Sequence, residues 1–217
     1  MFSVKKFDLL ISFYIVCIAI SELMGGKTFP LATLFGYQLN ASVAILVIPL
    51  VYGINDVITE VYGKTRARSV VRSGLLIVLF ILFFSLIATK LPPSSRFKST
   101  ESAYEIIFGL SARISAASLT AFALGEFLDV LLFAKLRQSF GKKYLWLRTN
   151  ISNFVSQFID TFVFMTLAFY AFDKSLSNNV MFLWSIILPY WLLKCFMSII
   201  ETPFVYVGVK WLKNEKE

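Results

Sequence analysis

Residues 74–88 read Gly-Leu-Leu-Ile-Val-Leu-Phe-Ile-Leu-Phe-Phe-Ser-Leu-Ile-Ala, without one charged side chain. With its flanks this stretch forms an apolar segment at 69–90, and a helix of about 20 such residues crosses the hydrocarbon core of a bilayer. The whole chain agrees: 58% of its 217 residues are hydrophobic, 16% are charged, and the mean hydropathy is +0.74. Soluble domains typically have about 25% charged residues. The sequence therefore predicts a membrane protein.

Six segments of this kind occur, and each is predicted to be a membrane-spanning helix. They lie near 8–24, 41–62, 69–90, 112–135, 150–172 and 181–209. The expected fold class is all-α, with residues 1–217 forming a single transmembrane domain. The segment 92–111 is expected to be the longest external connection. Two halves of three helices also suggest an inverted 3+3 repeat, because an odd number of spans reverses the orientation of the second half.

The distribution of basic residues supports the count of six spans. With these spans, 14 Lys and Arg residues lie on the side of the two termini and 6 on the opposite side. Cytoplasmic loops carry the excess of Lys and Arg in membrane proteins. We therefore expect a multi-pass protein of the bacterial inner membrane with both termini in the cytoplasm. The net charge of +8 then reflects topology, and no nucleic-acid partner is expected.

Several kinds of chemistry have no residues to support them. The chain contains no histidine, which excludes serine–histidine catalysis and histidine metal sites. Cys17 and Cys195 both fall in apolar segments and are interpreted as small hydrophobic side chains. No phosphate-binding motif of the form G-x-x-x-x-G-K-[ST] is present. We accordingly predict no catalytic residue, no metal site and no cofactor, and we do not expect an enzyme.

The acidic residues are unusually placed for a membrane protein. Seven of the thirteen fall inside the predicted spans, where one charge near the bilayer centre costs about 2.5–3.5 kcal/mol on insertion scales. These seven are Glu22, Asp56, Glu60, Glu126, Asp129, Asp160 and Glu201. Lys194 adds a basic residue to the last span. Charges of this kind within a membrane usually pair with one another or face a cavity that contains water.

Helical spacing gathers the polar side chains into one stripe on each of four segments. The stripes are Tyr52, Asp56 and Glu60; Glu126 and Asp129; Asn150, Asn153, Gln157 and Asp160; and Tyr190, Lys194, Ser198 and Glu201. Asn55 stands beside Asp56 as Gln157 stands near Asp160. We predict that these stripes line a solute pathway. The alternative is that they only hold the helices together, through hydrogen bonds and a pair between Lys194 and a carboxylate, although such contacts average only about 0.6 kcal/mol.

Several sequence motifs extend this interpretation. Residues 48–63 read Ile-Pro-Leu-Val-Tyr-Gly-Ile-Asn-Asp-Val-Ile-Thr-Glu-Val-Tyr-Gly, and Ala67-Arg68 follows. Further motifs are Ala112-Arg113-Ile114, Leu124-Gly125-Glu126-Phe127-Leu128-Asp129-Val130, Trp146-Leu147-Arg148-Thr149-Asn150-Ile151-Ser152, Ser156-Gln157-Phe158-Ile159-Asp160-Thr161, and Tyr190 with Lys194 and Pro203. In order and spacing they resemble the queuosine precursor transporter family, of the vitamin uptake group. The resemblance covers about residues 15 to 209.

The resemblance implies a six-helix importer of 7-deazaguanine bases, such as the cyano or aminomethyl form or queuine. Facilitated or proton-coupled alternating access are both consistent with it. It also implies that eight residues sit where the family keeps polar side chains, namely Asp56, Glu60, Glu126, Asp129, Asn150, Gln157, Asp160 and Lys194. The alternative is a substrate-binding membrane subunit of an energised vitamin uptake complex. The expected partners are a purine-like solute and the lipid bilayer, and a homodimer is left open.

Two departures from the family pattern add acidity. Glu22 stands where the first helix usually has an asparagine, and Glu126 stands where some members have glutamine. A substrate that carries an amine would fit both changes. Glu22, Arg113 and Glu201 are interpreted as gate or structural residues.

Overall fold

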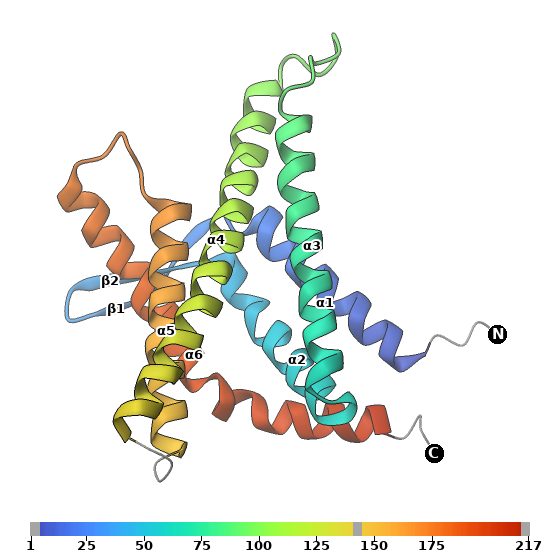
Figure 1. Cartoon of the computed structure of the whole chain (residues 1–217). Helices are drawn as coiled ribbons and strands as arrows, with labels where there is room; N and C mark the ends of the chain where they lie inside the picture. The colour runs from blue at the N-terminus through green and yellow to red at the C-terminus, as the bar shows by residue number, and fades with distance from the viewer. Residues whose placement is uncertain (1–4, 141–144, 214–217) are drawn as a thin grey trace. The chain divides into compact units, whose positions relative to one another are not determined.

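The computed structural model describes the backbone of residues 5–140 and 145–213, and their side chains except at 64, 126–140, 145–153, 156 and 197–202. The described chain is mostly helical (Figure 1). It contains the α-helices α1 (Lys6–Met24), α2 (Ile48–Tyr62), α3 (Lys64–Ala88), α4 (Glu101–Phe140), α5 (Leu145–Phe169) and α6 (Leu176–Lys213). A 3-10 helix, η1 (Val43–Leu46), precedes α2, and two strands, β1 (Thr28–Leu34) and β2 (Tyr37–Ser42), follow α1.

The helices α1 and α3 agree with the predicted spans because both are continuous apolar runs. In the described chain, four helical segments are long and apolar enough to cross a membrane, judged by length and composition. They are Lys6–Met24, Thr65–Ala88, Glu101–Gly125 and Leu176–Phe196. The predicted span 41–62 differs most, since its first residues belong to β2 and η1 and its helix has 15 residues. At 1.5 Å per residue, α2 is about 22 Å long, shorter than a hydrocarbon core of about 30 Å.

A hairpin of β1 and β2 corrects the expectation of an all-α fold. Phe35 and Gly36 connect the strands with φ of 49° and 80°, so the turn takes the left-handed conformation that two-residue hairpins prefer. Nothing lies within 4 Å of the position that a Cβ on Gly36 would occupy, and Phe35 is fully exposed. Apolar runs of spanning length did not reveal these strands, because β1 has 7 residues, β2 has 6, and both mix apolar with polar side chains.

The segment 92–111 is predicted to be an external connection with room for a short helix, and in the structure its second half is helical. Helix α4 begins at Glu101 and continues for 40 residues. Its first turns contain Glu101, Ser102 and Glu105, so this part of the helix is polar and a search for apolar runs begins too late. Pro49 lies well inside the predicted span 41–62, but in the structure it occupies the first turn of α2. Proline is tolerated there, since the first turn needs no backbone N–H donor.

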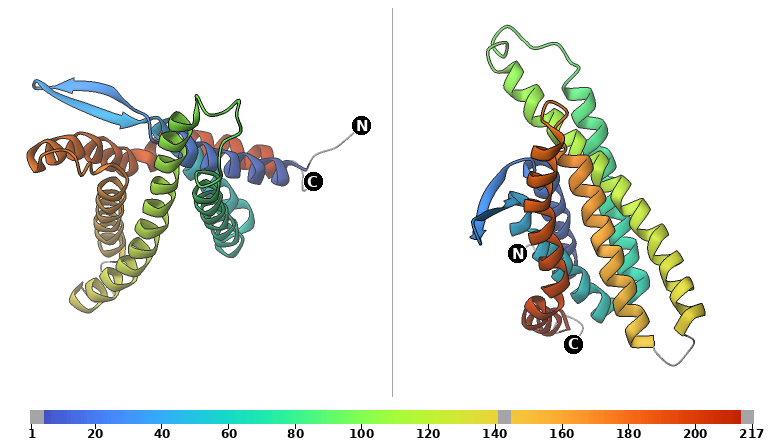
Figure 2. Two further views of the ribbon diagram at one scale, coloured as in Figure 1. Left: turned by 90° about the horizontal axis from the view of Figure 1, so that it is seen from above. Right: turned by 90° about the vertical axis from the view of Figure 1, so that its left-hand side faces the viewer.

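The chain forms two compact units, each with its own packing. Unit 1 comprises residues 1–29, 42–115 and 196–217, and unit 2 comprises residues 30–41 and 116–195. In unit 1, α1, α2 and α3 pack around a core of Tyr14, Ile54, Ile58, Ala67 and Val70. After the connection 89–100, the opening turns of α4 run back in the direction opposite to α3 (Figure 2).

In unit 2, the hairpin is fastened to the first part of α6. The Tyr37 hydroxyl donates to the backbone carbonyl of Met181, and Asn40 Nδ2 donates to Ser185 Oγ at 2.8 Å. Burial raises the pKa of the Tyr37 hydroxyl, so this group stays protonated and able to donate at neutral pH. Met165, Ala168, Ile186 and Ile187 fill the core between α5 and α6.

The contact of Gly208 with Val57 gives a first prediction about stability. A Cβ on Gly208 would lie 2.8 Å from Val57 Cγ2, and Val57 is buried and has a stiff, β-branched side chain. We expect Gly208→Ala to lower the free energy of unfolding by about 1–3 kcal/mol, as overpacking usually does. The measurement is thermal unfolding of the purified chain in detergent.

Gly109→Ala is the matched control for Gly208→Ala. Nothing lies within 4 Å of a Cβ on Gly109, which is also helical. This variant should raise the free energy of unfolding by up to about 1 kcal/mol, because alanine has the higher helix propensity. Equal unfolding temperatures for the two variants would contradict the close approach of α6 to α2.

Candidate functional site

The candidate site begins with an ion pair between α5 and α6 in unit 2. Lys194 Nζ lies 2.5 Å from Asp160 Oδ2, and the two side chains are 12% and 32% exposed, respectively. Asp160 lies in the apolar part of α5, and Lys194 belongs to the candidate span Leu176–Phe196. Two opposite charges at this distance stabilise one another strongly away from water, whereas either one alone would be costly. The sequence placed both residues on polar stripes, and the structure brings them together.

A third helix approaches Asp160 closely. A Cβ on Gly125 of α4 would lie 3.7 Å from both Cβ and Oδ1 of Asp160, which is an ordinary van der Waals distance. The glycine therefore lets the α4 backbone come near the carboxylate without a side chain between them. Three helices of unit 2 thus meet at Asp160. The next residue of α4 is Glu126, whose side chain lies outside the described residues.

An aromatic ladder follows the same two helices. It consists of Phe154, Phe158 and Phe162 on α5 and of Trp184 and Trp191 on α6. The ring centre of Phe158 lies 5.2 Å from that of Trp191, 6.3 Å from that of Trp184 and 6.2 Å from that of Phe162. Phe154 and Trp191 meet edge to face at 4.5 Å, and Trp191 Nε1 donates to the Phe154 carbonyl at 3.4 Å. Flat, partly exposed rings of this kind can stack on other flat rings.

The tryptophans of this ladder were not among the predicted site residues. Their signal in the sequence is spacing: Phe154, Phe158 and Phe162 are four residues apart, and Trp184 and Trp191 are seven apart. Both spacings place side chains on one face of a helix. Thr161, next to Asp160, is another residue that the sequence did not single out. It is 1% exposed, and its Oγ1 is buried without a hydrogen-bond partner among the described residues.

The predicted stripe on α2 lies on the exposed side of that helix. Tyr52, Asp56 and Glu60 are all exposed, whereas Ile54 and Ile58 enter the core of unit 1. The Oδ1 atom of the neighbouring Asn55 is buried without a hydrogen-bond partner among the described residues. The spacing therefore correctly placed these three residues on one face of α2. In the structure the carboxylates of Asp56 and Glu60 lie outside the core of unit 1.

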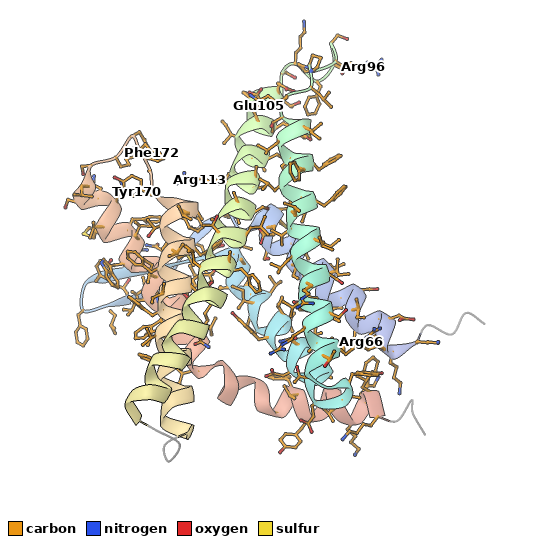
Figure 3. All side chains as sticks on the ribbon, in the orientation of Figure 1. Arg66, Arg96, Glu105, Arg113, Tyr170 and Phe172 are labelled. Atoms are coloured by element: carbon orange, nitrogen blue, oxygen red, sulfur yellow. The ribbon has the colours of Figure 1, made fainter. Side chains whose placement is uncertain are left out.

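Glu22 occupies a buried contact between α1 and α4 in unit 1. It is 6% exposed, and Ser115 Oγ donates to its Oε2 at 3.0 Å. One turn earlier on α4, Ser111 Oγ donates to the Leu23 carbonyl at 3.0 Å. Arg113 lies between these serines on α4 and has contacts of its own (Figure 3). These contacts support a structural role for Glu22, one of the two roles expected for it.

The remaining predicted residues are less informative. Gln157 is half-buried on α5. The side chains of Glu126, Asp129, Asn150, Asn153 and Glu201 lie outside the described residues.

Four apolar helices of spanning length are typical of a multi-pass membrane protein, and one of its helical units contains a charged pair between apolar helices. A family model described as "Putative vitamin uptake transporter" matches residues 42–208. The chain belongs to this family of membrane transporters.

Two proteins similar to this chain carry the same name. A "Probable queuosine precursor transporter" of Bacillus subtilis is 32% identical over 187 residues, which cover 84% of this chain and 77% of that protein. A "Probable queuosine precursor transporter" of Haemophilus influenzae is 30% identical over 136 residues, covering 62% of this chain and 54% of that protein. No solved structure matches the chain. The resemblance seen in the sequence motifs is therefore confirmed at the level of the family.

Proposed function

We propose that this chain imports a queuosine precursor, a 7-deazaguanine base, across the inner membrane. The names of its two relatives support the solute class. The structural observation that carries the proposal is the largely buried Asp160–Lys194 pair on the two helices that carry the aromatic ladder. Helices in membranes usually pack through small and uncharged polar side chains, so packing alone rarely requires a charged pair. Binding of a flat, polar solute uses both charged groups and aromatic side chains.

The chemistry of the solute fits these groups. A guanine-like edge presents an N–H and an adjacent NH₂, and a carboxylate offers two acceptor oxygens in matching geometry. Asp160 would accept these two hydrogen bonds, and Lys194 would neutralise the carboxylate while the site is empty. A ring of the ladder would stack on the flat base. Gln157 and the acidic residues Asp56, Glu60, Glu126 and Asp129 remain proposed substrate contacts, as do Tyr52, Asn55, Asn150 and Asn153.

The proposed mechanism is alternating access in a six-helix bundle. In this proposal α2 and α5 complete the six spans, as the second helix of each half of an inverted repeat. Short or interrupted helices at corresponding positions of two halves often mark the binding site of a transporter. The 15 residues of α2 and the polar first half of α5 fit that description. Both termini would then face the cytoplasm, in line with the distribution of basic residues.

The test is rescue of queuosine in a bacterium that neither makes deazaguanines nor imports them. We expect expression of this chain to restore queuosine in tRNA when the cyano form, the aminomethyl form or queuine is supplied, with an empty vector as control. The readout is the queuosine content of purified tRNA by mass spectrometry. Good membrane expression without rescue by any of the three bases would overturn the proposal.

The second candidate function is that of a substrate-binding subunit of an energised uptake complex, which the family description leaves open. Proteoliposomes that contain only this chain distinguish the two. Uptake of labelled base without ATP or another protein supports the importer. Rescue in cells together with no uptake in proteoliposomes would favour the subunit.

A further inference from the structure

The last part of α6 has two different stripes on its exposed side. Its buried side consists of Val205, Gly208, Val209 and Leu212, and Leu212 is fully buried. On the exposed side, Phe204, Val207 and Trp211 are three and four residues apart and therefore form one apolar stripe. Tyr206, Lys210 and Lys213 follow the same kind of spacing and form a second stripe, which is basic.

The side chains of the apolar stripe are exposed. Phe204 is 72% exposed, Val207 is 70% exposed and Trp211 is 38% exposed. The stripe lies within residues 203–213, the last part of α6. In unit 1 it runs across the beginning of α3 instead of alongside it (Figure 1). A helix with one apolar and one basic edge typically lies in the plane of the membrane interface.

Two further basic residues of unit 1 make contacts near Trp211, one through Lys6 itself and one through its neighbour Phe7. Lys6 Nζ donates to the Trp211 carbonyl at 2.8 Å and lies 5.4 Å from the centre of the Trp211 ring. The Arg66 guanidinium lies 5.1 Å from the centre of the Phe7 ring, at the beginning of α3 (Figure 3). These cation–π contacts hold two cations beside aromatic rings.

The charges around this surface are unbalanced. The segments 64–72 and 203–213 contain six basic residues and no acidic residue. The acidic residues nearest to them and to Lys6 in the sequence are Asp8, Glu60, Glu201, Glu215 and Glu217. Of the positive side chains, Lys210, Lys213, Arg66, Arg68 and Arg72 are all exposed. A small soluble anion would need only these charges. The adjacent exposed apolar stripe fits a ligand that has an acyl chain next to its phosphate.

From these observations we infer that Lys6, Arg66, Lys210 and Lys213, with Phe204, Val207 and Trp211, form a binding surface for anionic phospholipids. The phosphate of the headgroup lies at the basic side chains, and the acyl chains cover the apolar stripe. This surface belongs to unit 1 and does not involve Asp160 or Lys194. It therefore stands independently of the identity of the transported solute.

The test compares lipid binding to the full chain, purified in detergent, by native mass spectrometry. Phosphatidylglycerol and phosphatidylcholine with identical acyl chains are the two probes. We expect the wild type to bind phosphatidylglycerol more tightly. Lys210→Gln/Lys213→Gln should weaken this binding about thirtyfold, because each basic residue near an anionic surface contributes about fivefold. Phosphatidylcholine binding should not change. Equal affinity of the wild type for the two lipids would overturn the inference.

Lys90→Gln/Lys98→Gln is the matched control, because it removes the same charge from two exposed lysines near the other end of α3. Arg96 marks that end in Figure 3. A similar loss in this control would show that total charge, and not this surface, sets the affinity. If the double variant on α6 does not purify as folded protein, Lys210→Gln and Lys213→Gln are measured singly, with about fivefold expected for each.

A last variant separates a lipid from a free phosphate ion. Phe204→Ser/Val207→Ser keeps every charge and removes the apolar stripe. We expect it to weaken phosphatidylglycerol binding, and we expect millimolar inorganic phosphate not to displace the lipid from the wild type. Unchanged binding in this variant together with displacement by phosphate would assign the surface to a soluble anion and overturn the proposal.

Discussion

Asp160→Asn is expected to lower uptake of the base at least tenfold, because hydrogen bonds to a charged group contribute about 1.5–3 kcal/mol. It should also lower the free energy of unfolding by about 3 kcal/mol, since Lys194 is only 12% exposed and would lose its counter-ion. The measurements are queuosine in tRNA and thermal unfolding in detergent. Asp173→Asn is the matched control, because Asp173 pairs with Lys174 at 3.4 Å in an exposed position. It should change stability by less than about 1 kcal/mol.

The double variant Asp160→Asn/Lys194→Gln separates substrate binding from structural support. Removing both charges leaves neither one buried without its partner, so most of the lost stability should return. Uptake should not return, because the carboxylate that would accept the base is still absent. Normal uptake by this stable double variant would show that the pair only holds α5 and α6 together.

Phe158→Leu is expected to weaken the apparent affinity for the base about tenfold, because stacking of a base on one aromatic ring contributes about 1–3 kcal/mol. Phe158 is the ring of the ladder that contacts Phe162, Trp184 and Trp191. Leucine keeps most of the apolar contact, so the maximal uptake rate and the amount of folded protein should change little. The measurement is the KM of uptake in proteoliposomes.

Phe84→Leu is the control for the loss of one ring. Phe84 is 60% exposed on α3 and stacks on Phe80 at 6.0 Å. Its KM should equal that of the wild type. If Phe158→Leu also leaves KM unchanged, the ladder packs the two helices or contacts lipid, and the base is held elsewhere.

The sequence predicted best those helices whose apolar character is continuous. The observed bounds of helices α1 and α3 differ from their predicted spans by only a few residues. An apolar run in lipid must be helical, because only a helix satisfies its backbone hydrogen bonds within the run. Helix α4 was predicted too short since its first turns are polar. The β-hairpin was missed because its strands of 7 and 6 residues are much shorter than a spanning run. Its turn, Phe35-Gly36, is also not one of the dipeptides, such as Asn-Gly or Asp-Gly, that mark a two-residue hairpin.

The candidate site was predicted in part. Helical spacing placed Asp160 and Lys194 on polar stripes, and the structure pairs them at 2.5 Å. Spacing along one helix shows which side chains share a face, but not which face of another helix they contact. The sequence therefore could not show which of the seven acidic residues pairs with Lys194. The same limit applies to Glu22, whose partner Ser115 lies 93 residues away in the sequence.

The contact between Lys6 and Trp211 joins residues that are 205 positions apart. Unit 1 therefore combines helical segments from early and late positions in this sequence, whereas unit 2 ends at residue 195. Domains generally fold as their residues emerge during synthesis. The assembly of unit 1 can finish only after residues 196–217 have been synthesised. Loss of the last twenty residues would consequently affect the folding of the first helix as well as that of the C-terminus.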